Sequence, residues 1–147
     1  MTSSASAQSG RRDRRGRLVL EVRAGDRMVV NGAALEFTSR TSILLSNRAR
    51  FLFGKQLMAP EKATTPSRRL YFGIQSAYLA EPLERPGFVA LARALAADYM
   101  VATTSEEVRS VLRQALADLE ADRGWEALQA VRALFAHDDA MLGFEVG

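Results

Sequence analysis

Directly after residue 17, large apolar side chains occupy every second position, which is the period of a half-buried strand. In residues 18–23, Leu18, Leu20 and Val22 occupy every second position. Four more short β-type runs follow, at 28–30, 33–37, 41–45 and 48–53. Asn31-Gly32 lies between two of these runs and favours a type I′ hairpin turn, because both residues tolerate positive φ. We therefore predict about five short antiparallel strands, mostly arranged as a meander because their links are short.

Beyond Gly54 the apolar spacing changes to that of helices. Thr65-Pro66 predicts a helix start, since the threonine hydroxyl can cap free amides and proline suits the first helical position. This helix should end near residue 79. Three more helices are expected, over 87–101, from Thr104 to Gly124, and from 125 to about 143. Thr104 can form a capping box with Glu107 at the start of its helix. These last three helices resemble a small bundle. The fold class is therefore α+β, with a small antiparallel sheet followed by a four-helix region.

The same pattern divides the chain into three parts. Residues 1–17 combine small polar residues with an arginine cluster, and they cannot bury enough surface to offset chain entropy. We expect them to form a disordered basic arm, which either attracts a polyanion or serves as a solubilising tail. Residues 18–60 form the β-rich subdomain and residues 61–147 the helical subdomain.

Composition excludes several classes of function. The absence of cysteine rules out disulfides, thiol catalysis and cysteine-ligated zinc. No apolar run approaches the roughly 18 residues of a membrane-spanning helix, and the N-terminal residues lack the apolar stretch of a secretory signal. We expect a cytoplasmic protein.

Candidate chemistry is sparse. The one histidine, His137, precedes Asp138 and Asp139, but it has no second ligand cluster in the sequence. A cation near the C-terminus of a helix is favourable in its own right, so we interpret His137 as structural. Neither a nucleophile elbow nor a glycine-rich phosphate loop is found. We expect no enzymatic activity, no metal and no cofactor.

Charge is unevenly distributed. Residues 1–72 carry a net charge of +9 and residues 73–147 a net charge of −6. Such asymmetry indicates two surfaces with different partners. In a strand, Arg48 and Arg50 would share one face while Phe51 and Phe53 share the other. A basic sheet face suits an RNA backbone, but charged strand faces also keep sheets from aggregating, and spacing alone favours this plainer interpretation.

Several segments resemble the FlbT family, the flagellar biosynthesis repressors of alphaproteobacteria. The resemblance covers about residues 18–142 and is densest over residues 45–80. The matching segments are Gly25-Asp26, Val30-Asn31-Gly32-Ala33, Leu45 through Asn47-Arg48-Ala49, Met58-Ala59-Pro60-Glu61 and Thr65-Pro66-Ser67-Arg68-Arg69-Leu70-Tyr71-Phe72-Gly73-Ile74-Gln75.

The resemblance implies post-transcriptional control of flagellin. Members of the family are linked to the 5′ untranslated leader of flagellin mRNA, alter its translation or stability, and act with a small helical protein, FlaF. Some look like activators, so the sign of regulation does not transfer. The family offers no catalytic residue or cofactor. On this interpretation, the expected RNA contacts are Arg40, Arg48, Arg50, Lys55, Arg68 and Arg69.

A second hypothesis is a protein-binding adaptor that acts on FlaF or flagellin and affects RNA only indirectly. It rests on the acidic helical half, where the expected exposed residues include Glu81, Glu84, Asp138 and Glu145. Arg68 also has a structural alternative, in which it pairs with an acidic group and braces the sheet against the first helix. An exposed sheet edge would in addition allow a homo-oligomer.

Overall fold

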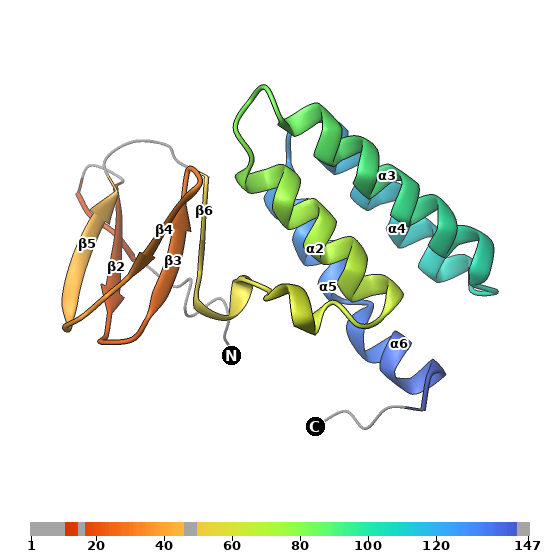
Figure 1. Ribbon diagram of the computed structural model, residues 1–147, viewed down its shortest axis with the longest axis horizontal. Helices are drawn as coiled ribbons and strands as arrows, with labels where there is room; N and C mark the ends of the chain where they lie inside the picture. Colours follow the sequence, from red (N-terminus) through yellow and green to blue (C-terminus); the bar gives the residue numbers. More distant parts are fainter. Residues whose placement is uncertain (1–10, 15–16, 46–49, 144–147) are drawn as a thin grey trace. The chain divides into compact units, whose positions relative to one another are not determined.

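The computed structural model describes residues 11–14, 17–45 and 50–143. The chain divides into two compact units, Met1–Leu57 and Met58–Gly147. Antiparallel strands make up the first and helices the second, which confirms the predicted α+β class (Figure 1). We call them the β unit and the helical unit.

The strands of the β unit form two three-stranded antiparallel sheets, with orders β1-β2-β5 and β4-β3-β6. Their bounds are β1 Arg11–Arg12, β2 Leu18–Val22, β3 Arg27–Val30, β4 Ala33–Glu36, β5 Thr41–Leu45 and β6 Phe51–Phe53. The predicted meander is wrong, because β2 and β3 follow each other in sequence yet lie in different sheets. The reason is the core, which the two sheets build together.

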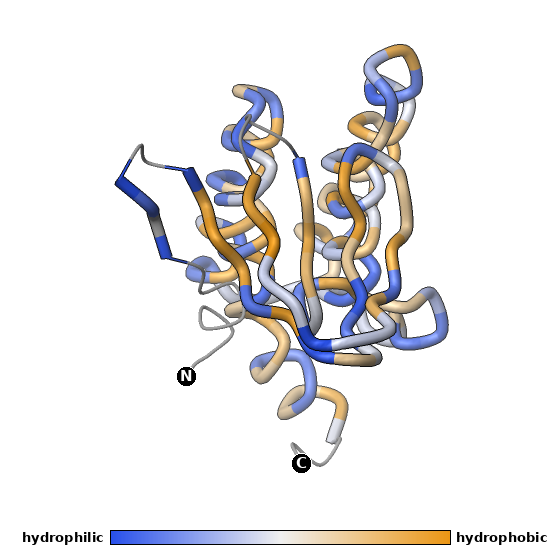
Figure 2. The backbone as a smooth tube through the Cα atoms, turned by 90° about the vertical axis from the view of Figure 1, so that its left-hand side faces the viewer, coloured by the Kyte–Doolittle hydropathy of each residue, from blue (hydrophilic) through white to orange (hydrophobic). Residues whose placement is uncertain are grey.

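That core consists of side chains that alternate along the strands. Leu20 and Val22 of β2 cluster with Met28 of β3 and Phe53 of β6, and all four are at most 6% exposed. Partly buried residues complete the cluster, namely Leu18, Val30, Phe37, Ile43, Leu45 and Phe51. Apart from the two arginines of β1, Figure 2 shows the strands as mainly hydrophobic and the turns as mainly hydrophilic. One face of each sheet thus supplies the core, as the alternation predicts.

Two local expectations in the β unit have different outcomes. Asn31 and Gly32 have φ of 48° and 86°, so the predicted hairpin turn between β3 and β4 is confirmed. Arg11–Arg12 form strand β1 against β2, whereas we expected disorder throughout residues 1–17. The edge of β2 offers backbone partners to this segment, and Arg17 pairs with Asp13 at 2.7 Å. Residues 1–10, 15 and 16 lie outside the described residues.

The described part of the helical unit begins with the short 3-10 helix η2, Pro60–Lys62, and continues with five α-helices. These are α2 Pro66–Leu79, α3 Arg85–Ala102, α4 Glu106–Glu120, α5 Gly124–Arg132 and α6 Phe135–Met141. Helix α2 matches its prediction, and the Thr65 hydroxyl accepts a hydrogen bond from the Arg68 amide. No helix among the described residues is long and apolar enough to cross a membrane.

Three details of the helical unit correct the sequence interpretation. Ser105, rather than Thr104, caps α4. Gly124 begins α5 instead of ending α4, and the predicted last helix is broken into α5 and α6 around Leu134, which is buried. Gly73 of α2 packs closely against α3, because a Cβ there would lie 3.2 Å from a Leu95 methyl carbon.

Candidate nucleic-acid interface

Four exposed basic residues gather at one end of the β unit, which we call the basic end: Arg23, Arg27, Arg40 and Lys55. Arg23 follows β2, Arg27 begins β3 and Arg40 precedes β5. Lys55 lies in the short 3-10 helix η1, Gly54–Gln56, directly after β6. Three separate segments of sequence therefore supply these charges, because Arg23 and Arg27 flank the same turn between β2 and β3.

Strand register brings these segments to the same end (Figure 1). Val22 pairs with Thr41, so the residues next to them, Arg23 and Arg40, flank the same end of the β2–β5 ladder. The Gly25 amide donates a hydrogen bond to the Phe37 carbonyl, and the Phe37 amide donates one to the Asp26 carbonyl. These bonds join the turn between β2 and β3 to the segment between β4 and β5. Met28 pairs with Phe53, so β6 ends beside the start of β3.

Acidic residues offset part of this charge. Glu36 lies opposite Arg27 in the β3–β4 ladder. Glu21 accepts hydrogen bonds from the Ser42 hydroxyl at 2.8 Å and from Arg11 at 3.1 Å. The Ser42 hydroxyl, followed by the Arg11 guanidinium, lowers the pKa of Glu21, and Arg40 adds to this effect through its charge. The basic end therefore consists of cations with a few fixed anions among them, rather than an unbroken positive patch.

The predicted contact strand 48–53 is only partly a strand. Arg50 precedes β6 and lies at the other end of the unit, where its backbone hydrogen-bonds to Asn31 in the β3–β4 turn. Arg48 lies outside the described residues. Arg40 and Lys55 of the predicted set are thus at one end of the β unit and Arg50 is at the other.

The remaining two predicted contacts, Arg68 and Arg69, lie in the first turn of α2. Arg69 is exposed. Arg68 makes a bidentate ion pair with Asp139 of α6, with N–O distances of 2.5 and 2.9 Å, and its guanidinium stacks over the Phe135 ring. Hydrogen bonding to Asp139 raises the pKa of Arg68 and lowers that of Asp139. The pairing with an acid was anticipated, but it joins α2 to α6.

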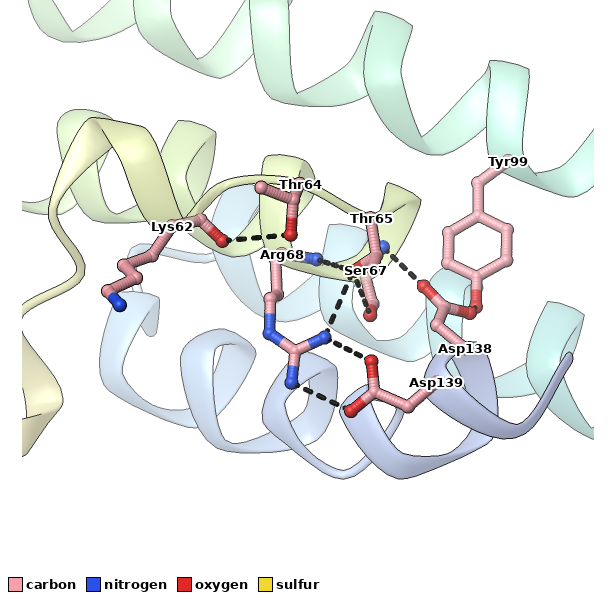
Figure 3. Close-up of polar contacts among 8 residues, drawn as sticks. All are labelled: Lys62, Thr64, Thr65, Ser67, Arg68, Tyr99, Asp138 and Asp139. Carbon is pink, nitrogen blue, oxygen red and sulfur yellow. Dashed lines mark hydrogen bonds and ion pairs between the residues drawn. The ribbon is translucent and has the colours of Figure 1, made fainter. Parts of the chain in front are cut away.

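Asp138, the neighbour of Asp139, faces the start of α2 from the same short helix (Figure 3). One carboxylate oxygen accepts a hydrogen bond from the backbone amide of Ser67 at 2.7 Å, and the other accepts one from the Tyr99 hydroxyl of α3. Asp138 therefore caps α2 from a distant part of the chain. A carboxylate near a helix N-terminus is favoured by the helix dipole.

This carboxylate pair is buried, contrary to the expectation that Asp138 is exposed. Asp138 and Asp139 are 4% and 6% exposed, and Tyr99 is 6% exposed. Burial, and then the hydrogen bond to Asp138, raises the pKa of the Tyr99 hydroxyl. Because each oxygen of these two carboxylates accepts a hydrogen bond, the arrangement is a structural junction of α2, α3 and α6.

Other arginines of the helical unit also make internal contacts. Arg85 donates to the carbonyls of Ala77 and Ala80, where α2 ends. Arg109 donates to those of Met100 and Thr103 at the end of α3. Such contacts satisfy carbonyls that helix ends leave without partners. Arginines at these positions stabilise the fold and are poor candidates for phosphate contacts.

Sequence reasoning missed Arg23 and Arg27 as members of the basic end. Their charge was visible, but their proximity to Arg40 depends on β2 pairing with β5 and on β3 lying in the other sheet. It also missed the burial of Asp138 and Asp139. The usable signal there was the adjacent pair of acids in a short helix whose other residues, apart from His137, are apolar.

Comparison with known proteins gives a consistent set of relatives. The family model described as flagellar protein FlbT matches residues 18–142. The chain is 31% identical over 125 residues to the probable flagellum biosynthesis repressor protein FlbT of Rhizobium etli (strain CIAT 652), covering 85% of this chain and 83% of that protein. A similarly named protein of Brucella anthropi is 31% identical over 127 residues, covering 86% and 82%. No solved structure matches.

Proposed function

The chain belongs to the FlbT family and so has a regulatory role in flagellum synthesis, and we propose that it acts by binding the 5′ untranslated leader of flagellin mRNA. Binding changes the translation or the stability of that message. The contact surface is the basic end of the β unit, formed by Arg23, Arg27, Arg40 and Lys55. The observation that carries the proposal is the convergence of these four exposed cations from three segments of the chain.

The chemistry of these side chains suits single-stranded RNA. Arginine donates to phosphate oxygens in a fixed fork and also stacks on unpaired bases, whereas lysine acts as a point charge. Each phosphate of a single strand that a cation neutralises releases counterions. It contributes about 0.7 to the slope of log binding constant against log salt concentration. Arg23 and Arg40 lie just beyond the ends of strands, whereas Arg27 is the first residue of β3 and Lys55 lies in η1. All four residues are exposed, so a flexible strand of RNA can reach them.

The test is a titration of a labelled flagellin leader with purified protein at several salt concentrations. Arg40→Gln combined with Lys55→Gln should weaken binding and lower the salt slope by about 0.7 for each lost contact. The matched control, Arg93→Gln with Arg113→Gln, removes two exposed charges from the helical unit and should leave both quantities unchanged. Equal losses in both variants, or binding that does not depend on salt, would overturn the proposal.

The other predicted contacts are assigned by separate variants. Arg48→Gln with Arg50→Gln tests the arginines of the predicted contact strand, of which Arg50 lies at the other end of the β unit. Arg69→Gln tests the exposed position on α2. Crosslinking and sequencing of RNA bound in cells, with the Arg48/Arg50 variant alongside the Arg40/Lys55 variant, identifies which end contacts the message. Loss of crosslinks in the Arg48/Arg50 variant alone moves the contact surface away from the basic end.

A second function, a protein-binding adaptor, is supported by one specific observation. Leu83 is 97% exposed in the connection between α2 and α3, and it lies between the exposed acids Glu81 and Glu84. An apolar side chain flanked by two acids suits a basic surface on a partner protein, and the candidate partners are FlaF and flagellin. Co-purification should then survive nuclease and be lost in Leu83→Ser, but not in Val101→Ser, whose side chain is 86% exposed on α3. Loss of the partner on nuclease treatment alone would exclude this function.

A further inference from the structure

Strand β4 is an edge strand whose core side is incomplete. It hydrogen-bonds to β3 within the order β4-β3-β6, and Figure 1 draws it in front of β3. All four of its residues are exposed. Leu35 pairs with Met28, so both side chains lie on the core face of the sheet. Met28 is 1% exposed but Leu35 is 42% exposed, which leaves an apolar side chain uncovered at the margin of the core.

The backbone of β4 also presents hydrogen-bonding groups outward. The two-residue turn at Asn31-Gly32 makes Val30 and Ala33 the closing pair of the hairpin. In an antiparallel ladder, alternate residues direct their amide and carbonyl toward the partner strand. Leu35 and then Phe37, whose amide donates to the Asp26 carbonyl, continue that series toward β3. Ala34 and Glu36 therefore direct their backbone groups away from the sheet.

Proteins usually protect such an edge with lysine, proline or a bulge. Residues 33–36 read Ala-Ala-Leu-Glu and contain no lysine, arginine or proline. Glu36, the one charged side chain, lies opposite Arg27 of the same sheet. The edge is thus short but open to pairing.

We propose that β4 pairs antiparallel with β4 of a second copy of this chain, about a two-fold axis at Leu35. In this register Leu35 opposes Leu35 of the second copy, and Ala34 opposes Glu36 of the second copy. Two independent requirements are met together. Residues that oppose each other point to the same face, and the residues with outward backbone groups, Ala34 and Glu36, oppose one another.

This register forms four backbone hydrogen bonds and joins the two β4-β3-β6 sheets into one. Met28 and Leu35 of both copies then form one continuous apolar row, in which the two Leu35 side chains cover each other. Glu36 meets the small Ala34 rather than a like charge, so the pairing opposes no two charges directly. A shift by one residue would place the two cores on opposite faces of the joined sheet and leave outward backbone groups unmatched.

The contact is small, because it consists of one four-residue strand from each copy. Interfaces of this size are weak, so we expect self-association that depends on protein concentration. Antiparallel pairing places the two basic ends at opposite ends of the joined sheet. The proposal goes beyond RNA binding and does not depend on it.

Cysteine crosslinking tests the register directly, because the chain contains no cysteine. Opposed residues of a non-hydrogen-bonded pair have Cα atoms about 4.5 Å apart, within the range of about 4.4–6.8 Å that a disulfide spans. Leu35→Cys should therefore form a disulfide dimer under mild oxidation. Glu36→Cys should not, because its diagonal distance of about 7–8 Å is too long. Leu44→Cys, at 43% exposure, measures crosslinking by random collision.

Sedimentation over a range of protein concentrations tests the association without oxidation. Wild type should move from monomer toward dimer as concentration rises. Ala34→Pro, which removes an outward amide, and Leu35→Lys should stay monomeric with an unchanged melting temperature. Leu44→Lys should associate as wild type does. A wild type that is monomeric throughout, or a Leu35→Cys yield no higher than that of Leu44→Cys, would overturn the proposal.

Discussion

Replacing Asp138 with alanine should destabilise the helical unit strongly, because two buried donors lose their acceptor. The Ser67 amide, 2.7 Å from the carboxylate, belongs to a residue that is 0% exposed, and the Tyr99 hydroxyl belongs to one that is 6% exposed. An unsatisfied buried donor costs about 1–3 kcal/mol. The two together predict a loss of about 2–6 kcal/mol in the free energy of unfolding.

Asparagine at the same position should cost less. Its amide is nearly the same shape as the carboxylate, keeps one acceptor for the Ser67 amide, and can donate to the Tyr99 oxygen instead of accepting from it. The charge that favours the N-terminus of α2 is lost, which adds about 0.3–1 kcal/mol. The order of stability should therefore be wild type, then Asp138→Asn, then Asp138→Ala.

Thermal unfolding followed by far-ultraviolet circular dichroism measures this, because the helical signal reports on the helical unit. A chain of this size loses about 2–4 °C in melting temperature for each kcal/mol, so Asp138→Ala should melt at least about 4 °C lower. The control is Glu120→Gln, which breaks an exposed ion pair with Arg93 and should change stability by less than about 1 kcal/mol. If Asp138→Ala and the control melt alike, the junction is not structural.

Three further predictions concern the helical unit. The pKa of Asp139 is lowered in the folded state, so its contribution is present above the ordinary carboxyl pKa and is lost as the pH falls through the lowered value; acid unfolding should show this loss, and Asp139→Asn should remove it. Gly124→Ala should destabilise by about 1–3 kcal/mol, since its Cβ would lie 2.7 Å from a Tyr78 ring carbon, whereas Gly87→Ala meets open space and should not, as urea titration can measure. Thr65→Ala removes the cap of α2 and should cost about 1 kcal/mol in the same titration.

Features set by neighbouring residues were predictable from the sequence. Helix α2 begins where Thr65-Pro66 predicts, because the cap and the fixed φ of proline act within one turn. The hairpin turn at Asn31-Gly32 depends on two residues with positive φ. Alternation along β2 identified Leu20 and Val22 as core residues. In each case the deciding interaction lies within a few positions along the chain.

Features that depend on distant contacts were not predictable in this way. The predicted last helix is broken between α5 and α6. Asp138 and Asp139, which lie in α6 after the break, contact residues 71 positions earlier in the chain. No local signal near Leu134 marks that requirement. The strand order likewise follows from a core shared by two sheets, whereas short links favoured a meander. Short links limit which strands can be neighbours, but burial decides which of them pair.

The residues of the candidate site likewise include some that the sequence predicted and some that only the fold revealed. Arg40 and Lys55 were predicted from their charge together with the family resemblance, and they remain candidates because they are exposed. Arg23 and Arg27 join them only after the β2–β5 register and the two-sheet arrangement are known. The sequence shows which residues are charged, but only the fold shows which of them lie together on one surface.

Arg68 shows why exposure must be weighed together with pairing. It lies in the segment that most resembles the FlbT family, yet its guanidinium already holds both oxygens of Asp139 and covers the Phe135 ring. A phosphate that took the two donors now paired with Asp139 would displace that carboxylate, which is 6% exposed and would be left without its cation. Arg69, one position along α2 and exposed, carries no such cost. If the helical unit contacts RNA, Arg69 is therefore the residue to change first, and a loss of binding in Arg68→Ala should be accompanied by a lower melting temperature.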